Sequence, residues 1–293
     1  MALGDVTARI VRSDGQEMTI GDGDWRILKD GLENWANLPY SVSSAELPST
    51  DGAIVTSKRV SAVDRTIKAE CRSDDPDGSR AEAIRFFNPK YSFEVHMTYR
   101  GRTRWCVGEQ TGFKASEGNM YERPQITWTI LCANPYLLSE DDFGKDIAEI
   151  LPMGGFPWGS LIKKTDKVNR GALVSAYAFS RSVTVTNDGD VPSSMKVIIR
   201  AKGDVKNPSI RLGDGYVRLI KTLKEGDVLI FDCTKKPPTV TLNGKNVMNL
   251  VDRKSSILGL RVDVGEAMLE YDAEDGYQRM SVTVYWNKQY LGI

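Results

Sequence analysis

The chain has 293 residues, enough for about two domains, each with a hydrophobic core of its own. Lysine plus arginine and aspartate plus glutamate both number 39, so the formal net charge is zero. Such a chain lacks the basic surplus typical of nucleic-acid-binding proteins. Little self-repulsion opposes its assembly with further copies of itself.

The composition argues against most catalytic and metal sites. The single histidine, His96, alternates with the side chains of Val95 and Met97, as expected for a strand residue on the more polar face. Histidine is the usual general base and zinc ligand, so its scarcity disfavours both roles. The four cysteines have no CxxC spacing, which predicts small, buried, reduced side chains rather than a disulfide framework (Cys71, Cys106, Cys132 and Cys233). We expect no catalytic residue, no cofactor and no bound metal.

Targeting signals are not evident. No apolar run is long enough to cross a bilayer, and charges at Asp5 and Arg9 interrupt the N-terminal segment, unlike a signal peptide. We expect synthesis in the cytoplasm and no membrane contact.

The N-terminal part indicates short strands separated by turns. Trp25, Leu28, Leu32 and Trp35 recur at helical spacing, a weak signal because Gly31 interrupts it. Residues 39–53, which include a proline and an Asp-Gly turn, predict a long exposed loop. Alternating apolar residues predict strands at 6–11, 18–20, 60–71, 91–99, 103–108 and 125–132.

One α-helix is predicted at about residues 79–88. Ser79 and Glu82 have the spacing of a capping box. Asn88-Pro89 ends the helix, because the residue before a proline avoids helical geometry. The acidic residues 74–78 lack the closing glutamate of an EF-hand calcium loop, so a polar turn is the better interpretation.

The pattern changes after residue 138, where an acidic run follows Asn134-Pro135 and about forty irregular residues begin. From Ser182 onward, short alternating strands recur with turns between them, including Asn187-Asp188-Gly189 and Asn243-Gly244. One of these strands is expected at 257–260. The C-terminal part therefore predicts an antiparallel β-sandwich.

The sequence contains no GxSxG, Walker A, helix-opening GxGxxG or HExxH motif. Acid pairs such as Asp141-Asp142, or Glu270 with Asp272, have the chemistry of a glycosidase. A solvated loop and an ordinary strand face explain them better, because charged side chains are mostly exposed. A hydrolase is the least favoured hypothesis.

Several segments, in order, resemble the distal tail protein family of long-tailed phages, often called Dit. In the N-terminal part they are 46–53 (ELPSTDGA) and 85–90 (RFFNPK). In the C-terminal part they are 184–192 (TVTNDGDVP), 196–203 (KVIIRAKG), 207–210 (NPSI), 223–229 (LKEGDVL), 240–246 (VTLNGKN) and 289–293 (QYLGI). The resemblance covers most of the chain, through the order and spacing of the segments together.

The resemblance implies a mainly β protein with two domains. Residues 1–138 would be a tail-tube-like β-sandwich or barrel that carries the short helix and closes into a hexameric ring. Residues 139–293 would be a galectin-like antiparallel sandwich on the outside, with 287–293 closing the sandwich or returning to the first domain. The ring would join the tail tube protein to the tail-tip hub, carry receptor-binding or baseplate proteins, and touch DNA only as it passes through the channel.

Such a protein would be a non-enzymatic structural component of the virion at the tail tip, made in the host bacterial cytoplasm. Ring interfaces are heterologous, so protruding segments are the natural contacts between subunits. The candidate inter-subunit contacts lie in the segment 39–53 and in the turn at 100–104: Glu46, Leu47, Pro48, Asp51, Arg100, Arg102 and Arg104.

The alternative is a carbohydrate-binding tail protein that recognises host surface glycans through the C-terminal sandwich. Its stacking residues would be among Trp158, Tyr177, Tyr216 and Trp286. Packing in a core is the competing explanation for each of them. Sugar-binding galectins use a histidine in their site, and the C-terminal domain has none.

Overall fold

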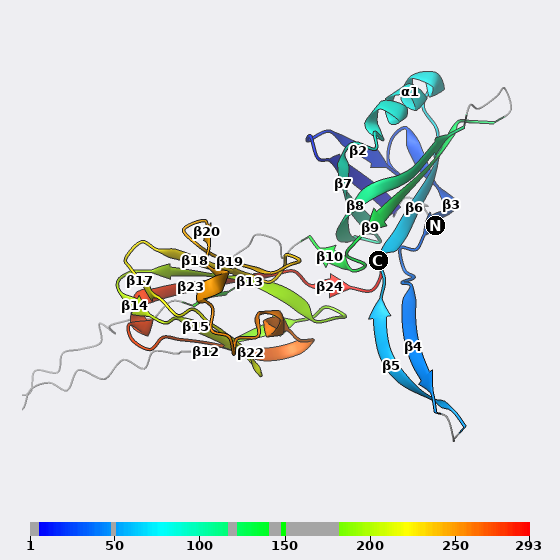
Figure 1. Ribbon diagram of the computed structural model, residues 1–293. Helices are drawn as coiled ribbons and strands as arrows, with labels where there is room; N and C mark the ends of the chain where they lie inside the picture. Colours follow the sequence, from blue (N-terminus) through cyan, green and yellow to red (C-terminus); the bar gives the residue numbers. More distant parts are fainter. Residues whose placement is uncertain (1–5, 48–50, 117–121, 141–147, 151–181) are drawn as a thin grey trace, which may run out of the picture. The chain divides into compact units, whose positions relative to one another are not determined.

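The computed structural model describes residues 6–47, 51–116, 122–140, 148–150 and 182–293, with only the backbone described for 148–150 (Figure 1). The chain divides into two compact units. The first contains residues 1–141, 189–191 and 288–293, and the second contains 142–188 and 192–287. The last residues of the chain thus lie with the N-terminal unit.

The N-terminal unit is built on an antiparallel sheet with the order β2-β1-β7-β8-β9-β6-β3. The strands are β1 (Val6–Arg12), β2 (Glu17–Ile20), β3 (Trp25–Glu33), β6 (Val63–Cys71), β7 (Ser92–Tyr99), β8 (Arg102–Ala115) and β9 (Gln125–Cys132). A short strand, β10 (Leu137–Ser139), pairs with β8 and with β24 (Gln289–Tyr290) from the end of the chain. The mainly β fold predicted from the sequence is confirmed.

The core of this unit gathers around the fully buried Trp128 of β9. Its ring centre lies 4.7 Å from that of Phe87 and 5.3 Å from that of Phe93. Phe87 follows the helix and Phe93 belongs to β7, so one aromatic cluster joins helix and sheet. Ile126 and Ile130 share the buried face of β9 with Trp128, as the alternation predicted.

The predicted helix is present as α1 (Pro76–Phe86), but it begins before Ser79. Asp75 is the N-cap, and its side chain accepts a hydrogen bond from the Gly78 amide at 3.0 Å. The capping box expected at Ser79 is wrong, because the Ser79 hydroxyl donates instead to Asp24 at 2.9 Å. Pro76 suits the first helical position, where no amide proton is needed.

The cap residue of α1 gives a first prediction. Asp75→Ala should lower the free energy of unfolding by about 1 kcal/mol, because the first turn loses an acceptor for its free amides. Denaturant unfolding of the full chain measures the loss. Asp74→Ala, an exposed aspartate one residue earlier, is the control and should change little. Equal losses in the two variants would contradict the assignment of the cap.

The weak helical signal at Trp25 to Trp35 is wrong, because residues 25–33 form strand β3 beside β6. The register between these strands shifts between Ile27 and Leu32, which lets both tryptophans reach the core at 3% and 2% exposure. Gly31 lies in the shifted stretch, where a Cβ would come within 2.4 Å of the Lys68 carbonyl oxygen. The helical spacing is therefore produced by a bulged strand.

The loop expected at 39–53 is replaced by an antiparallel hairpin. Strand β4 (Tyr40–Glu46) pairs with β5 (Ala53–Val60), and in the described residues these two strands form a sheet with each other alone. The serine-rich composition hid the alternation of the few apolar residues in β4. Only the tip keeps the predicted Asp-Gly turn.

The C-terminal unit is the predicted antiparallel sandwich. One sheet has the order β11-β23-β13-β18-β19-β20 and the other the order β12-β22-β15-β16. The first sheet contains β11 (Ala148–Ile150), β13 (Ser193–Ala201), β18 (Val228–Asp232), β19 (Thr239–Leu242), β20 (Lys245–Asn246) and β23 (Met280–Trp286). The second contains β12 (Ser182–Asn187), β15 (Ser209–Leu212), β16 (Gly215–Arg218) and β22 (Gly265–Asp272).

Shorter elements complete the sandwich. Strands β14 (Val205–Lys206) and β17 (Thr222–Leu223) pair with each other, and β21 (Arg261–Val262) pairs with β13. Three short 3-10 helices are described: η1 (Met248–Leu250), η2 (Ile257–Gly259) and η3 (Tyr277–Arg279). The strand expected at 257–260 is therefore wrong, since η2 occupies it. The Gly259 amide bonds to the Ser256 carbonyl oxygen at 3.0 Å, closing a local turn.

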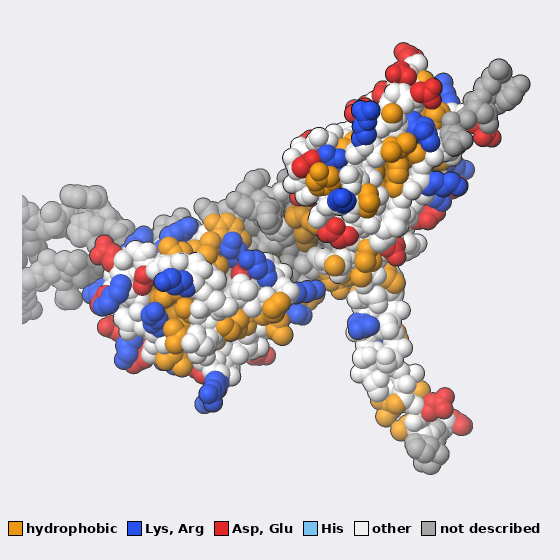
Figure 2. Space-filling model, turned by 45° about the horizontal axis from the view of Figure 1, so that its top comes forward, with side chains coloured by type: hydrophobic (Ala, Val, Ile, Leu, Met, Phe, Trp, Pro, Cys, Tyr) orange, Lys and Arg blue, Asp and Glu red, His pale blue; other side chains and the backbone are white. Residues whose placement is uncertain are grey.

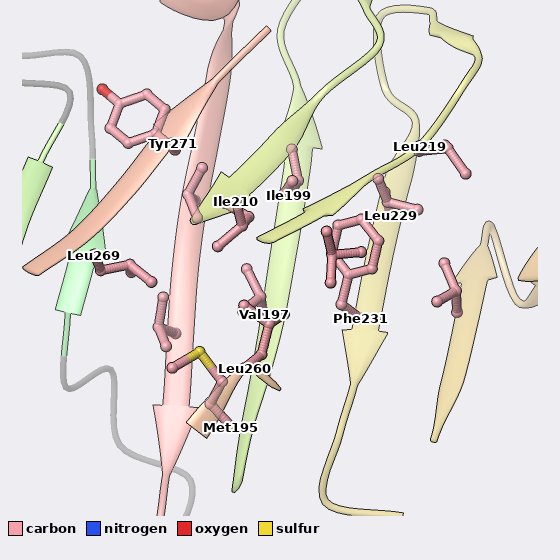
Figure 3. Close-up of a cluster of buried hydrophobic side chains, with 14 of the residues drawn as sticks. Met195, Val197, Ile199, Ile210, Leu219, Leu229, Phe231, Leu260, Leu269 and Tyr271 are labelled. Carbon is pink, nitrogen blue, oxygen red and sulfur yellow. The ribbon is translucent and has the colours of Figure 1, made fainter. Parts of the chain in front are cut away.

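The core of the sandwich lies between its sheets (Figure 3). Val197 and Ile199 of β13 and Phe231 of β18 meet Ile210 and Leu269 of the opposite sheet, and all are fully buried. Alternating strands direct every second side chain inward, which explains how short segments supply a continuous core.

Candidate assembly surfaces

The hairpin β4–β5 is exposed along its whole length. Every residue of β4 is exposed or half-buried, and β5 is exposed up to Val60. Two-stranded hairpins are only marginally stable in water without packing against something else. The hairpin therefore has the properties of a segment that acquires its packing from a partner.

The two faces of this hairpin differ in chemistry. Tyr40, Val42 and Val55 share one face and are 68%, 58% and 50% exposed. The other face carries Ser41, Ser43 and Ser57, together with Arg59, Ala45 and the 54% exposed Ile54. An exposed apolar face on a narrow ribbon is unfavourable in water and favourable in an interface.

The tip and base of the hairpin carry opposite charges. Glu46 and Asp51 lie at the tip, while Lys58 and Arg59 lie toward the base, and Figure 2 shows the acidic side chains at the end of the projection. Leu47, also at the tip, is 41% exposed. Of the candidate contact residues in this segment, Pro48 lies outside the described residues. The candidate contact residues Glu46, Leu47 and Asp51 therefore all lie at the tip of the β4–β5 hairpin.

The second candidate region is the turn between β7 and β8. Arg100 and Gly101 have φ values of 49° and 78°, as in the tight turns that join antiparallel strands. Arg100 and Arg102 are exposed, and the Arg100 guanidinium lies 5.5 Å from the centre of the Tyr99 ring. Both arginines are therefore available to an acidic partner surface.

Arg104 differs from the other two arginines, because its guanidinium is occupied within the chain. It stacks on the Tyr290 ring at 3.7 Å from the ring centre and donates a hydrogen bond to the Gly292 carbonyl oxygen. Burial lowers the pKa of Arg104 from its usual value, and the group remains a cation. The Asp190 carboxylate holds the same tail by accepting from the Leu291 amide at 3.0 Å. These residues form a clasp around the last residues of the chain.

The lone histidine belongs to a polar cluster in the N-terminal unit. His96 is 9% exposed, and its ring nitrogens lie 2.8 Å from a Glu94 oxygen and 3.1 Å from a Glu140 oxygen. Its ring stacks on Trp105 with 6.1 Å between centres. Arg9 is 3.5 Å from the same Glu140 carboxylate. The sequence placed His96 on the polar face but indicated nothing of Glu140, which is distant along the chain.

The aromatic residues considered for sugar stacking do not form a platform in the described residues. Trp286 is 3% exposed and belongs to the sandwich core. The Tyr216 hydroxyl donates to Asp252 at 3.1 Å, and burial is the main cause of its raised pKa. Trp158 and Tyr177 lie outside the described residues.

The described part of the chain contains no group of three or more His, Cys, Asp or Glu side chains arranged to hold a metal ion. None of the helices described has the length and apolar character needed to cross a membrane. Glu270 and Asp272 are exposed on β22, and Asp141-Asp142 lies outside the described residues. All four cysteines are buried and free, as predicted.

Comparison with known protein families gives a match for the C-terminal part of the chain. Residues 188–290 match the family model described as the siphovirus-type tail component, C-terminal domain. The matched residues contain the described strands of the second unit from β13 to β23. No curated protein matches the chain.

Two solved structures are similar in fold to nearly the whole chain. The crystal structure of the Dit protein of phage SPP1, described as a paradigm of the hub adsorption apparatus in phages infecting Gram-positive bacteria, aligns with a TM-score of 0.61 at 12% identity. The alignment covers 96% of this chain and 98% of the SPP1 protein. A chain of the phage p2 baseplate aligns with a TM-score of 0.51 at 11% identity, over 98% of this chain and 99% of that one. The chain has the Dit fold, and the predicted resemblance to distal tail proteins is confirmed.

The C-terminal clasp gives a second prediction. Arg104→Leu should release the tail, because it removes both the ring stacking and the bond to Gly292. Hydrogen exchange at the Tyr290 and Leu291 amides should become roughly tenfold faster, as a local loss of one strong hydrogen bond implies. Arg102→Leu, an exposed neighbour, is the control. Unchanged exchange in the Arg104 variant would contradict the clasp.

Proposed function

We propose that this protein is a subunit of a hexameric ring at the distal end of a phage tail. The ring joins the tail tube protein to the tail-tip hub, and the C-terminal sandwich carries receptor-binding or baseplate proteins. It works in the virion without catalysis, after synthesis in the host bacterial cytoplasm, and DNA passes through its channel. The tail component family of residues 188–290 and the Dit fold of the whole chain support this assignment.

The observation that carries the ring proposal is the apolar face of the β4–β5 hairpin. Tyr40, Val42 and Val55 are half or more exposed on a ribbon with no other strand beside it among the described residues. Burial of such side chains is the main favourable term in protein association. In a head-to-tail ring the face lies against a different surface of the neighbouring subunit, which is the heterologous geometry that closes a ring.

The charges of the hairpin fit the same arrangement. The acidic tip with Glu46 and Asp51 and the basic turn with Arg100 and Arg102 belong to one unit but to different elements. In a ring of identical copies, one copy's acidic tip and the next copy's basic turn are complementary surfaces. Complementary charges of this kind set orientation more than they add affinity. Leu47 and Pro48 would contribute to the same contact.

The C-terminal sandwich is better suited to docking proteins than to binding sugars. Trp286 is in the core and so offers no stacking surface. Large apolar side chains are instead exposed on this unit among its described residues: Ile220, Leu258, Val264 and Met268, each more than half exposed. Apolar surface of this kind is typical of contacts with other proteins.

The ring proposal predicts the effect of charge on the apolar face. Val42→Asp combined with Val55→Asp should reduce the fraction of assembled rings roughly tenfold or more, because carboxylates taken out of water in an interface oppose association. Light scattering and negative-stain imaging of the purified protein, and complementation of tail assembly in infected cells, measure the effect.

The opposite face of the same hairpin supplies the matched control. Ser41→Asp combined with Ser57→Asp adds the same charge at a similar place along the ribbon, but on the other face, and Ser41 lies opposite Arg59 as Val42 lies opposite Lys58. This control should assemble like the unmodified protein. Rings that tolerate both aspartates on the apolar face would remove the hairpin from the interface.

A further inference from the structure

The sheet of the N-terminal unit has a gap on one side of β8. Away from β7, Glu109 pairs with Leu131 of β9, and Trp105 pairs with Leu138 of β10. Between these two pairs, residues 106–108 pair with β7 alone among the described strands. The segment that joins β9 to β10 therefore passes around this part of β8 instead of lying beside it.

A buried arginine anchors that connecting segment. Arg65 of β6 is fully buried, and its Nη2 donates to the Pro135 carbonyl oxygen at 2.7 Å. Pro135, between β9 and β10, is itself buried. A proline has no amide proton to give to a neighbouring strand, so it cannot continue the pairing with β8. The gap is thus a fixed feature of the fold.

The gap forms a hollow with a volume of about 300 Å³ and mainly apolar walls. Its lining residues include Cys106, Val107, Glu109, Leu131, Tyr136 and Leu138. Val107 and Leu131 are 48% and 37% exposed. The volume is far larger than the roughly 30 Å³ of a water molecule in the liquid, so apolar side chains of another molecule fit into it. Exposed apolar walls favour such an occupant.

Opposite charges lie at the two ends of this part of β8. The basic turn with Arg100 and Arg102 is at the start of the strand, and Glu109 lines the hollow. Arg102 and Glu109 are both exposed and seven positions apart. In an extended strand this separation is roughly 20 Å. Along β8, a positive turn is therefore followed by an apolar hollow and then by a negative side chain.

The β4–β5 hairpin has the complementary order. Asp51 at its tip and Lys58 on β5 are exposed and also seven positions apart. Lys58 lies directly opposite Val42, so the two side chains share the apolar face. Val55, on the same face, lies between the two charges. The hairpin thus presents a negative tip, two valines and a positive side chain at a spacing close to that along β8.

We propose that the hollow beside β8 receives the hairpin of a second copy of this chain, with Val42 and Val55 as the side chains that fill it. The inference rests on the proposed ring and adds the surface on which the hairpin packs. Both valines are at least half exposed while the hollow is open in the same chain, so the occupant comes from another copy. One hairpin and one hollow on every copy give the heterologous contact that a ring requires.

The charges define the orientation of this contact. With the valines in the hollow, Asp51 lies toward the neighbouring copy's Arg102, and Lys58 lies toward its Glu109. The reversed orientation brings like charges together at both ends. Burial of the apolar side chains favours association, and the charges select one register.

A cross-link tests which surfaces meet. Val42→Cys combined with Val107→Cys in the full chain is treated with a short bismaleimide, which the four buried native cysteines do not reach. We expect a ladder of linked copies on a denaturing gel, because assembly holds position 42 of one copy beside position 107 of the next. Ser43→Cys with Val107→Cys is the matched control on the other face of the hairpin. It should link at least about tenfold less, since its thiol lacks the high effective concentration.

A charge exchange tests the register. Lys58→Glu alone and Glu109→Lys alone each place like charges together, so each should lower the fraction of assembled rings about fivefold in light scattering. The two substitutions combined restore opposite charges and should restore assembly. All these side chains are exposed, so the variants should fold, and circular dichroism checks that they do.

The outcomes separate this inference from the proposed ring. Rings of the unmodified protein, with no more cross-linking in the Val42 variant than in the Ser43 control, would remove the hollow as the acceptor and leave the ring in place. Assembly that the combined charge exchange does not restore would do the same. An unmodified protein that stays monomeric at high concentration would overturn both proposals.

Discussion

The N-terminal unit depends on the packing of Trp128 against Phe87 and Phe93. This contact joins α1 to the sheet at β7 and β9, so the helix and the sheet share one core. Aromatic side chains bury large areas and pair in preferred geometries, which makes such a cluster a strong organiser. The β4–β5 hairpin lies almost entirely outside this core, and of its residues only Val60, at the end of β5, packs against it.

The same unit also accommodates charge inside its core. Arg12, 6% exposed, donates to the Phe86 carbonyl oxygen at 3.0 Å and pairs with Asp14, so its burial is compensated at the end of α1. Arg65 has backbone acceptors but no carboxylate in the described residues. The Arg65 guanidinium also lies 5.4 Å from the centre of the Trp35 ring, so carbonyl oxygens and an aromatic ring accommodate this charge, where a carboxylate accommodates that of Arg12.

The fold of the C-terminal unit follows more directly from the sequence, because the alternation of apolar and polar residues accounts for its buried and exposed faces. The inward side chains of β13, β18 and β22 meet across the sandwich, and turns with glycine at positive φ connect neighbouring strands, as at Gly244. Trp286 is buried in this core, so its ring is not exposed for stacking on a sugar. The apolar side chains exposed on the surface of this unit are of the kind found in contacts with other proteins.

The sequence by itself determined the mainly β class, the C-terminal sandwich, the one helix and the resemblance to distal tail proteins, because alternation and turn chemistry are local properties. It missed β3, since a bulge gives a strand the spacing of a helix. It missed the N-cap, because Asp75 and Ser79 are both suitable caps and a contact with Asp24 decides between them. Only the tertiary structure could bring Arg104 to Tyr290 and Arg65 to Trp35, because these pairs join segments that no local pattern relates.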